Sequence, residues 1–140
     1  MSAFAITFAD STFARADAHN RFDLALGVEA TLALTVGGRL IYTEPMFPIV
    51  ELRQALSAWM LHTGEDFEFT SMESDEPGLI WIRRQPSGLW RAGSIHQDDI
   101  ATQELDTAEV VHGCADFVGR VDGWVRDELG VEVRDVLGGD

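Results

Sequence analysis

Ser94, His96 and Asp98 alternate along the chain, and their side chains are of the types that serve as nucleophile, base and orienting acid in covalent catalysis. Same-face neighbours on a strand stand about 6–7 Å apart, whereas such a triad needs hydrogen bonds of about 2.6–3.2 Å. His96 and Asp98 with Asp99 also provide metal-ligand types, but no second cluster of ligands accompanies them. We therefore expect an exposed polar strand end, with no catalytic residue and no metal site.

Cys114 is the only cysteine of the chain, and it lies between Val110 and Phe117 on a stripe of apolar residues at helical spacing. A buried thiol in that setting behaves as a small hydrophobic group with a raised pKa. The sequence contains no glycine-rich nucleotide-binding motif, no zinc-protease motif and no nucleophile elbow. It therefore favours a non-enzymatic function and predicts no cofactor.

The most distinctive feature is an acidic segment, in which six carboxylates fall within twelve residues that contain no arginine or histidine. Phe67, Phe69 and Met72 are interleaved with them. One interpretation is a solvated hairpin coated with acids. The other is a recognition surface for a basic partner, where the charge raises the encounter rate and the aromatic residues serve as anchors. The second interpretation gives the candidate partner-binding site, formed by Glu65, Asp66, Glu68, Glu73, Asp75 and Glu76.

Two tryptophans, Trp81 and Trp90, flank a predicted turn at 85–88. Arginines lie close to both of them in the sequence, so guanidinium groups are placed to stack on the indole rings. Packing of the rings within a sheet is a more common role for such residues than a ligand cage. The arginines concerned are Arg83, Arg84 and Arg91.

The net charge of the chain limits the kinds of partner that it can bind. The 140 residues include 10 basic side chains, all of them arginine, and 24 acidic ones, which gives a net charge of −14. Such a charge repels nucleic acid and anionic membrane surfaces and favours a basic protein partner. No apolar stretch approaches the roughly 20 residues needed to cross a bilayer, and no basic region precedes the first apolar residues. We expect a cytoplasmic protein.

The elements that would position these residues begin with strands. Period-2 alternation predicts a strand over Phe4–Phe8, interrupted by a polar stretch from Asp10 to Asn20. Gly37-Gly38 separates two further runs and has the composition of a two-residue hairpin turn. Pro45 and Pro48 are expected to stop the sheet.

Two helices and a second meander complete the prediction. The first helix starts at Pro48 and stops by Gly64, and a long second helix spans Thr107–Leu129, with Asp106 or Thr107 as N-cap and Gly130 at its end. Strands around Phe67–Phe69, 79–82 and 89–95 lie between them. The order predicts a single α+β domain over residues 1–140, with an antiparallel sheet and two helices packed on one face.

A resemblance rests on residues that form the fold: Gly38–Tyr42, Phe47–Leu52 with Leu56 and Trp59, and Glu76–Ile80. In these stretches the chain resembles small uncharacterised domains of high-GC bacteria. In size, acidity and layout it resembles the immunity proteins of bacterial polymorphic toxin systems. The resemblance implies a protein that binds and blocks a cognate toxin, often a basic nuclease, and it carries no catalytic residue across.

We therefore expect a non-enzymatic acidic domain that binds a basic protein, as an immunity-type inhibitor does. One alternative is a small-molecule-binding or enzymatic α+β domain with a pocket between sheet and helices, where His96, Asp98 and Trp90 would line the mouth. Another is a structural module in which a sheet edge such as Phe4–Phe8 pairs with a second copy, giving a homodimer.

Overall fold

The computed structural model describes residues 3–13, 28–62, 64–71, 78–97, 103–130 and 132–133. The first sheet consists of β1 (Phe4–Phe13), β2 (Val28–Val36) and β3 (Arg39–Pro48), which pair antiparallel in the order β1-β2-β3. Every second residue of β2, from Val28 to Val36, is buried, because strand side chains alternate between two faces and only one face meets the core. Gly37 and Gly38 join β2 to β3 with φ of 61° and 79°, which confirms the predicted hairpin turn.

Two boundaries in this sheet differ from the sequence prediction. The polar stretch at Asp10 does not interrupt the first strand, which continues to Phe13 after an irregularity in its pairing with β2. Pro45 does not stop the sheet either, because β3 is an edge strand and an edge tolerates a residue without an N–H. The rest of the predicted polar stretch, residues 14–20, lies outside the described residues.

Helix α2 (Ile49–Met60) follows β3 directly, with Pro48 at its N-cap. The fixed φ of proline suits the start of a helix, where an N–H would find no partner within the helix. The helix buries Leu52 and Leu56 and ends at Met60, before Gly64. Its last turn is closed by the N–H groups of the residues that follow rather than by a glycine.

The remaining strands form a second sheet. β4 (Phe67–Phe69), β5 (Ile80–Arg84) and β6 (Trp90–Gly93) pair antiparallel in that order and are followed by a 3₁₀ turn, η1 (Ile95–Gln97). The α+β class and the antiparallel pairing are confirmed, but the strands build two sheets where the sequence suggested one. A physical reason lies in β3, since Pro45 and Pro48 offer no N–H to a further strand and the chain leaves the sheet into α2.

Helix α3 (Thr107–Leu129) has the bounds predicted from the sequence. Asp106 accepts a hydrogen bond from the Glu109 N–H, and Glu109 accepts one from the Asp106 N–H, so a capping box starts the helix. Gly130, with φ of 69°, ends it in a left-handed conformation. Gly113 allows close approach to β1, since a Cβ there would lie 2.7 Å from the Phe4 carbonyl oxygen.

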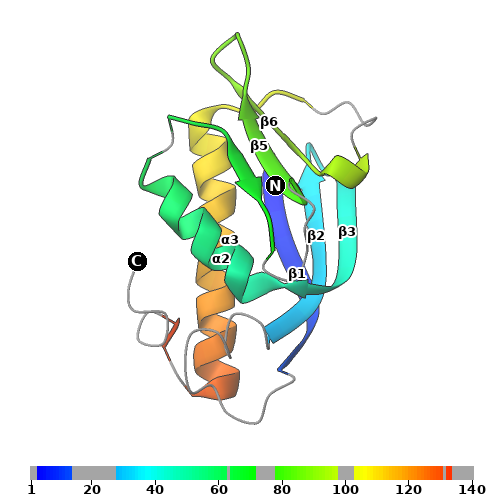
Figure 1. The fold of residues 1–140 in the computed structure, drawn as a ribbon, viewed down its shortest axis with the longest axis vertical. Coiled ribbons are helices and arrows are strands. Elements are labelled where there is room, and N and C mark those ends of the chain that lie inside the picture. Colours follow the sequence, from blue (N-terminus) through cyan, green and yellow to red (C-terminus); the bar gives the residue numbers. More distant parts are fainter. Residues whose placement is uncertain are drawn as a thin grey trace.

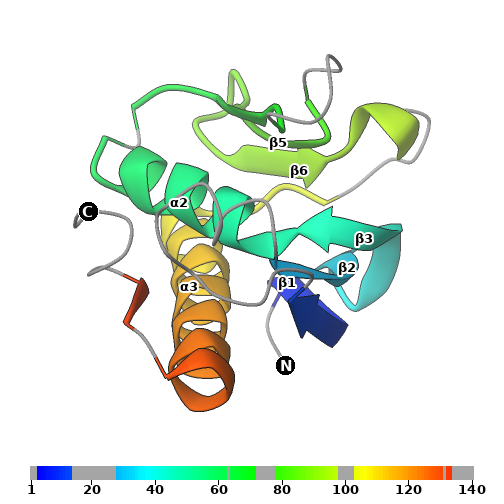
Figure 2. The same cartoon turned by 60° about the horizontal axis from the view of Figure 1, so that its bottom comes forward.

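The helices lie on one face of the first sheet, as predicted, with α3 against β1 and α2 against β2 and β4 (Figure 1). Figure 2 shows the second sheet as a separate layer that lies across α2 and the first sheet. Buried side chains from both sheets and both helices form one hydrophobic cluster. None of the helices in the described ranges is long and apolar enough to cross a membrane.

A buried ion pair joins the two helices. Arg53 of α2 donates from Nε to Asp122 Oδ1 of α3 at 2.7 Å and from Nη2 to Oδ2 at 3.0 Å. The Arg53 side chain is 4% exposed and that of Asp122 is 32% exposed. This bidentate geometry fixes both the spacing and the rotation of the helices, because the planar guanidinium matches the carboxylate edge.

Candidate functional site

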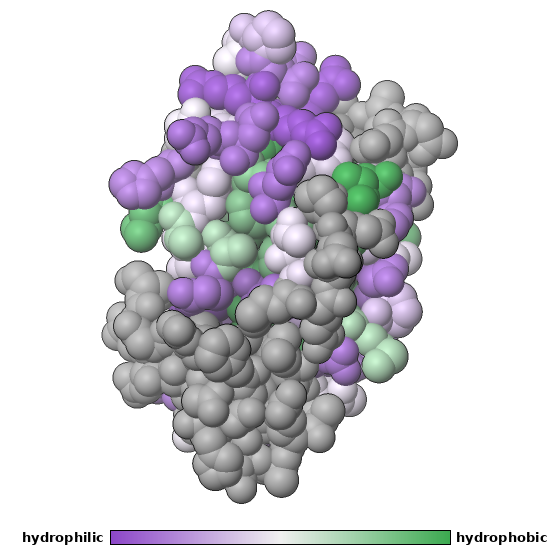
Figure 3. Space-filling model, viewed as in Figure 1, coloured by the Kyte–Doolittle hydropathy of each residue, from purple (hydrophilic) through white to green (hydrophobic). Residues whose placement is uncertain are grey.

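The acidic segment predicted from the sequence surrounds β4. Glu65, Asp66 and Glu68 are exposed, whereas Phe67 and Phe69 point into the core and cannot serve as surface anchors. Figure 3 shows hydrophilic side chains gathered over the region that the second sheet occupies in Figure 1. The rest of the predicted site lies outside the described residues: Glu73, Asp75 and Glu76.

The three described acids make contacts with their own surroundings. Asp66 Oδ1 accepts a hydrogen bond from the Arg84 backbone N–H at 2.8 Å, and Glu68 faces Arg83 across β4 and β5 at 3.5 Å. The Glu65 carbonyl accepts a hydrogen bond from Trp59 Nε1 at 2.8 Å. The first two contacts hold β4 against the β5–β6 hairpin, and the third joins the segment before β4 to α2. Arg83 offsets part of the local negative charge.

Ser94 and His96 are close in space, and the contact between them is a hydrogen bond within a local turn. Ser94 is buried, and its Oγ accepts a hydrogen bond from the His96 backbone N–H at 3.2 Å at the start of η1. The His96 ring stacks with Tyr42 at a centroid distance of 6.1 Å. Asp98 and Asp99 lie outside the described residues. Within the part of the chain that is described, no group of three or more histidine, cysteine, aspartate or glutamate side chains is arranged to hold a metal ion.

Cys114 lies on the buried face of α3, as predicted. Desolvation by burial raises the pKa of its thiol to about 12, because the protein interior disfavours the charged thiolate. The thiol therefore stays protonated at neutral pH and lacks the nucleophilic form.

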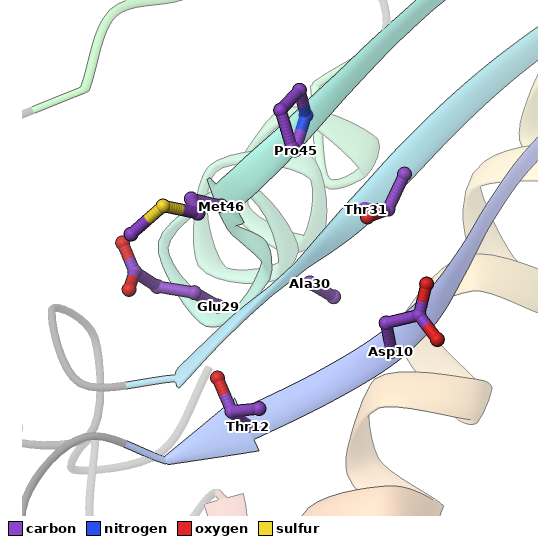
Figure 4. A pocket seen from close by; sticks show the side chains of 7 residues that line it. All are labelled: Asp10, Thr12, Glu29, Ala30, Thr31, Pro45 and Met46. Carbon is purple, nitrogen blue, oxygen red and sulfur yellow. The ribbon is translucent and has the colours of Figure 1, made fainter.

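The structure also contains a pocket that the sequence did not point to, with a volume of about 250 Å³ at one end of the first sheet (Figure 4). All three strands contribute to it. β1 supplies Asp10 and Thr12, β2 supplies Glu29, Ala30 and Thr31, and β3 supplies Pro45 and Met46.

Irregular backbone shapes this pocket. The pairing of β1 with β2 shifts between Ala9 and Thr12, and the pairing of β2 with β3 shifts opposite Thr31, so both neighbours of β2 bulge at the same level. Asp10 and Met46 stand in these bulges, each with φ of 56°. Among the described non-glycine residues only these two have positive φ. Such a conformation is costly for a methionine, and bulges and strained residues are enriched beside functional sites.

The pocket is lined by two carboxylates, which lie on opposite sides in Figure 4, by two hydroxyls and by the three apolar side chains of Ala30, Pro45 and Met46. Neither Asp10 nor Glu29 forms an ion pair or a side-chain hydrogen bond with any described residue, and Met46 is 71% exposed. An anionic pocket beside an exposed, flexible thioether can accept a cationic group and pack against the apolar stem that carries it. The arrangement could not be inferred from the sequence, where Asp10 and Glu29 are far apart and only the strand register brings them together.

A family model described as a domain of unknown function, DUF7878, matches residues 4–127, and the chain belongs to this family. The match begins in β1 and ends in α3, so it covers both sheets and both helices. No match to the chain was found among the curated proteins or among the solved structures.

Proposed function

We propose that this domain is a non-enzymatic binding protein whose partner is a basic protein. The observation that carries the proposal is the pair of carboxylates, Asp10 and Glu29, which line one pocket and meet no cation in the described ranges. The net charge of −14 supports it, because a strongly acidic protein attracts a basic one over a distance of about 8–10 Å at physiological salt.

In this proposal a lysine or arginine of the partner enters the pocket. Its charged group meets the Glu29 carboxylate, which lies beside Met46 in Figure 4, and the Asp10 carboxylate on the far side of the pocket adds negative charge. Its aliphatic stem packs against Met46, whose exposure makes it available for that contact. The acidic segment around β4 remains a second candidate surface, in which Asp66 and Glu68 already have contacts with the neighbouring hairpin.

A finer version of the proposal is that the domain acts as an immunity-type inhibitor in a high-GC bacterium. Its support is the resemblance in size, acidity and layout, together with the acidic pocket. An inhibitor of this kind needs no chemistry of its own, since it acts by covering the toxin. The partner would then be a basic toxin, and its gene would lie beside that of this protein.

The test compares affinity captures from the native host lysate at low and at moderate salt. Asp10→Asn with Glu29→Gln removes two charges from the pocket, and Asp127→Asn with Glu128→Gln removes two charges from the exposed end of α3 as the matched control. A third bait carries Glu68→Ser, Glu73→Ser and Asp75→Ser. We expect wild type and the α3 control to recover the same basic protein, and the pocket variant to lose it, with recovery falling as salt rises.

Equal loss with the pocket and α3 variants would show attraction by net charge alone and would refute the pocket as the site. If only the third bait failed to recover the basic protein, the binding surface would be the acidic segment rather than the pocket. For the immunity version, the recovered protein is expressed alone and together with this domain. Growth arrest by the partner, relieved by the wild-type domain, is the expected result, and arrest without relief would exclude an inhibitor.

The pocket also supports a second candidate, a domain that binds a small cationic molecule. The interpretation that placed Trp90 at a pocket mouth is wrong, because Trp90 is 1% exposed and donates from Nε1 to Thr107 Oγ1. The pocket at Asp10 and Glu29 replaces that location. A small amine that raises the melting temperature of wild type, but not of the pocket variant, would favour this candidate over a protein partner.

A further inference from the structure

The outer face of the second sheet carries a cluster of cationic and aromatic side chains, defined here as Trp81, Arg83 and Arg91. Trp81 pairs with Gly93 across β5 and β6, and Arg83 pairs with Arg91. Because alternate residues of a strand share a face, these four positions lie on the same side of the sheet. The opposite side of the sheet carries Ile82, Ala92 and the other buried residues.

Contacts within the sheet hold the Trp81 ring in place. A Cβ on Gly93 would lie 2.6 Å from Trp81 Cζ2, so the ring rests on a position where only glycine fits. The Arg83 Cζ lies 4.3 Å from the centroid of the same ring, which confirms the predicted stacking. A stacked guanidinium keeps its plane fixed, so its N–H groups are directed before any ligand arrives.

Two nitrogens of the cluster are buried without an acceptor. The Trp81 and Arg91 side chains are partly exposed, but the Nε1 atom of Trp81 and the Nε atom of Arg91 are buried and form no hydrogen bond with any residue that the structure describes. Buried donors in proteins are nearly always paired, so two such donors on one sheet face call for an acceptor from outside. Trp81 and Arg91 are diagonal neighbours on adjacent strands, about 7–8 Å apart, which brings both side chains within reach of one small anion.

The charge of the cluster fits an anion. Arg83 and Arg91 project from the same face, and the described acid that pairs with this face is Glu68, at 3.5 Å from Arg83. Burial strengthens a hydrogen bond to an anion, because the desolvated donor exchanges no water for it. This places a local site for an anion on a chain whose net charge is −14.

We propose that the cluster of Trp81, Arg83 and Arg91 binds the carboxylate group of a small molecule. A carboxylate is planar and singly charged, so it matches a guanidinium edge and is repelled less by the acidic chain than a phosphate would be. The Trp81 ring already carries a guanidinium, which disfavours stacking of a nucleobase there. This site is opposite in sign to the pocket at Asp10 and Glu29 and does not depend on the proposed function.

The experiment observes the indole N–H of Trp81 by nitrogen-15 NMR, with its signal identified by Trp81→Phe. Sodium acetate is the probe, and sodium chloride at the same ionic strength is the reference. We expect the Trp81 indole signal to shift in a saturable way with acetate at millimolar concentration and to stay in place with chloride. Inorganic phosphate serves as a third titrant.

Three variants locate the response. Arg91→Gln and Arg83→Gln are each expected to weaken acetate binding at least tenfold. Arg84→Gln removes the same charge from the same hairpin, but Arg84 lies over Trp90 on the other side, so binding is expected to stay within about twofold. The backbone amide spectrum shows whether each variant is folded. If Arg91→Gln does not fold, the test uses Arg83→Gln alone.

Several results would overturn the proposal. A Trp81 signal that does not shift, or that shifts equally with chloride, would mean that no carboxylate reaches the indole. If Arg84→Gln weakened acetate binding as much as Arg83→Gln and Arg91→Gln do, the effect would come from the net charge of the hairpin rather than from the cluster. Saturation by phosphate at a lower concentration than acetate would refute the assignment of a carboxylate.

Discussion

Gly113 and Gly119 of α3 provide a comparison in which one substitution tests the packing of helix on sheet. A Cβ at Gly113 would lie 2.4 Å from Phe4 Cδ2 and 2.7 Å from the Phe4 carbonyl oxygen, while a Cβ at Gly119 would meet nothing within 4 Å. Both glycines lie in the interior of the same helix. Changing each to alanine therefore alters helix propensity equally and packing only at Gly113.

The magnitudes separate the two variants. Alanine is favoured over glycine in a helix interior by about 1 kcal/mol, so Gly119→Ala should stabilise the fold by about that amount. At Gly113 the same gain is opposed by overpacking, which costs about 1–3 kcal/mol. Phe4 is 1% exposed and the clash involves its backbone, so it cannot move aside cheaply. Gly113→Ala should thus be less stable than Gly119→Ala by about 1–3 kcal/mol.

Urea unfolding followed by circular dichroism measures the difference, and thermal unfolding checks it. At roughly 4 °C per kcal/mol for a chain of this size, the melting temperatures should differ by about 4–12 °C. The urea dependence of the unfolding free energy should be the same in both variants, because the exposed surface hardly changes. If the two alanines stabilised the fold equally, the close approach of α3 to β1 would be refuted.

Three further predictions concern single residues. Asp122→Asn should lower the free energy of unfolding by about 3 kcal/mol in urea titrations, because it replaces the negative partner of a bidentate pair whose guanidinium is buried. Asp106→Ala should lower the free energy of unfolding by about 1 kcal/mol, because the Glu109 N–H loses its acceptor. Asp106→Asn keeps a side-chain acceptor and should retain most of this stabilisation. Cys114 should resist alkylation by iodoacetamide at pH 8 in the native protein and react in urea, as mass spectrometry would show, because burial raises its pKa to about 12. Since that pKa is raised above the ordinary thiol value of 9.0, the unfolded chain loses its proton first, and the free energy of unfolding should fall between pH 9 and pH 12.

The elements that the sequence predicted well carry local signals. The bounds of α3 follow from a capping residue at Asp106, a stripe of apolar side chains and Gly130, all within one segment. The hairpin at Gly37-Gly38 and the pairing of β5 with β6 likewise follow from turn residues between alternating runs. Such signals need no knowledge of distant parts of the chain.

What the sequence missed depends on contacts between distant segments. Arg53 and Asp122 look like ordinary surface charges until the crossing of α2 and α3 places them together. The separation into two sheets depends on which strand edges remain available after β3 turns into α2. The pocket at Asp10 and Glu29 requires two bulges at the same level of β2, and a period-2 pattern cannot reveal an extra residue in a strand.

The edge strand β3 has a consequence for how this protein behaves when it is concentrated. An exposed strand edge is a template on which another molecule can add a strand, and long regular edges lead to fibrils. In β3, Pro45 and Pro48 withhold two N–H groups, and the bulge at Met46 breaks the regular spacing of the remaining ones. A second molecule would therefore find only a short, irregular row of hydrogen-bonding groups along this edge, so β3 is a poor template for the growth of a continuous sheet.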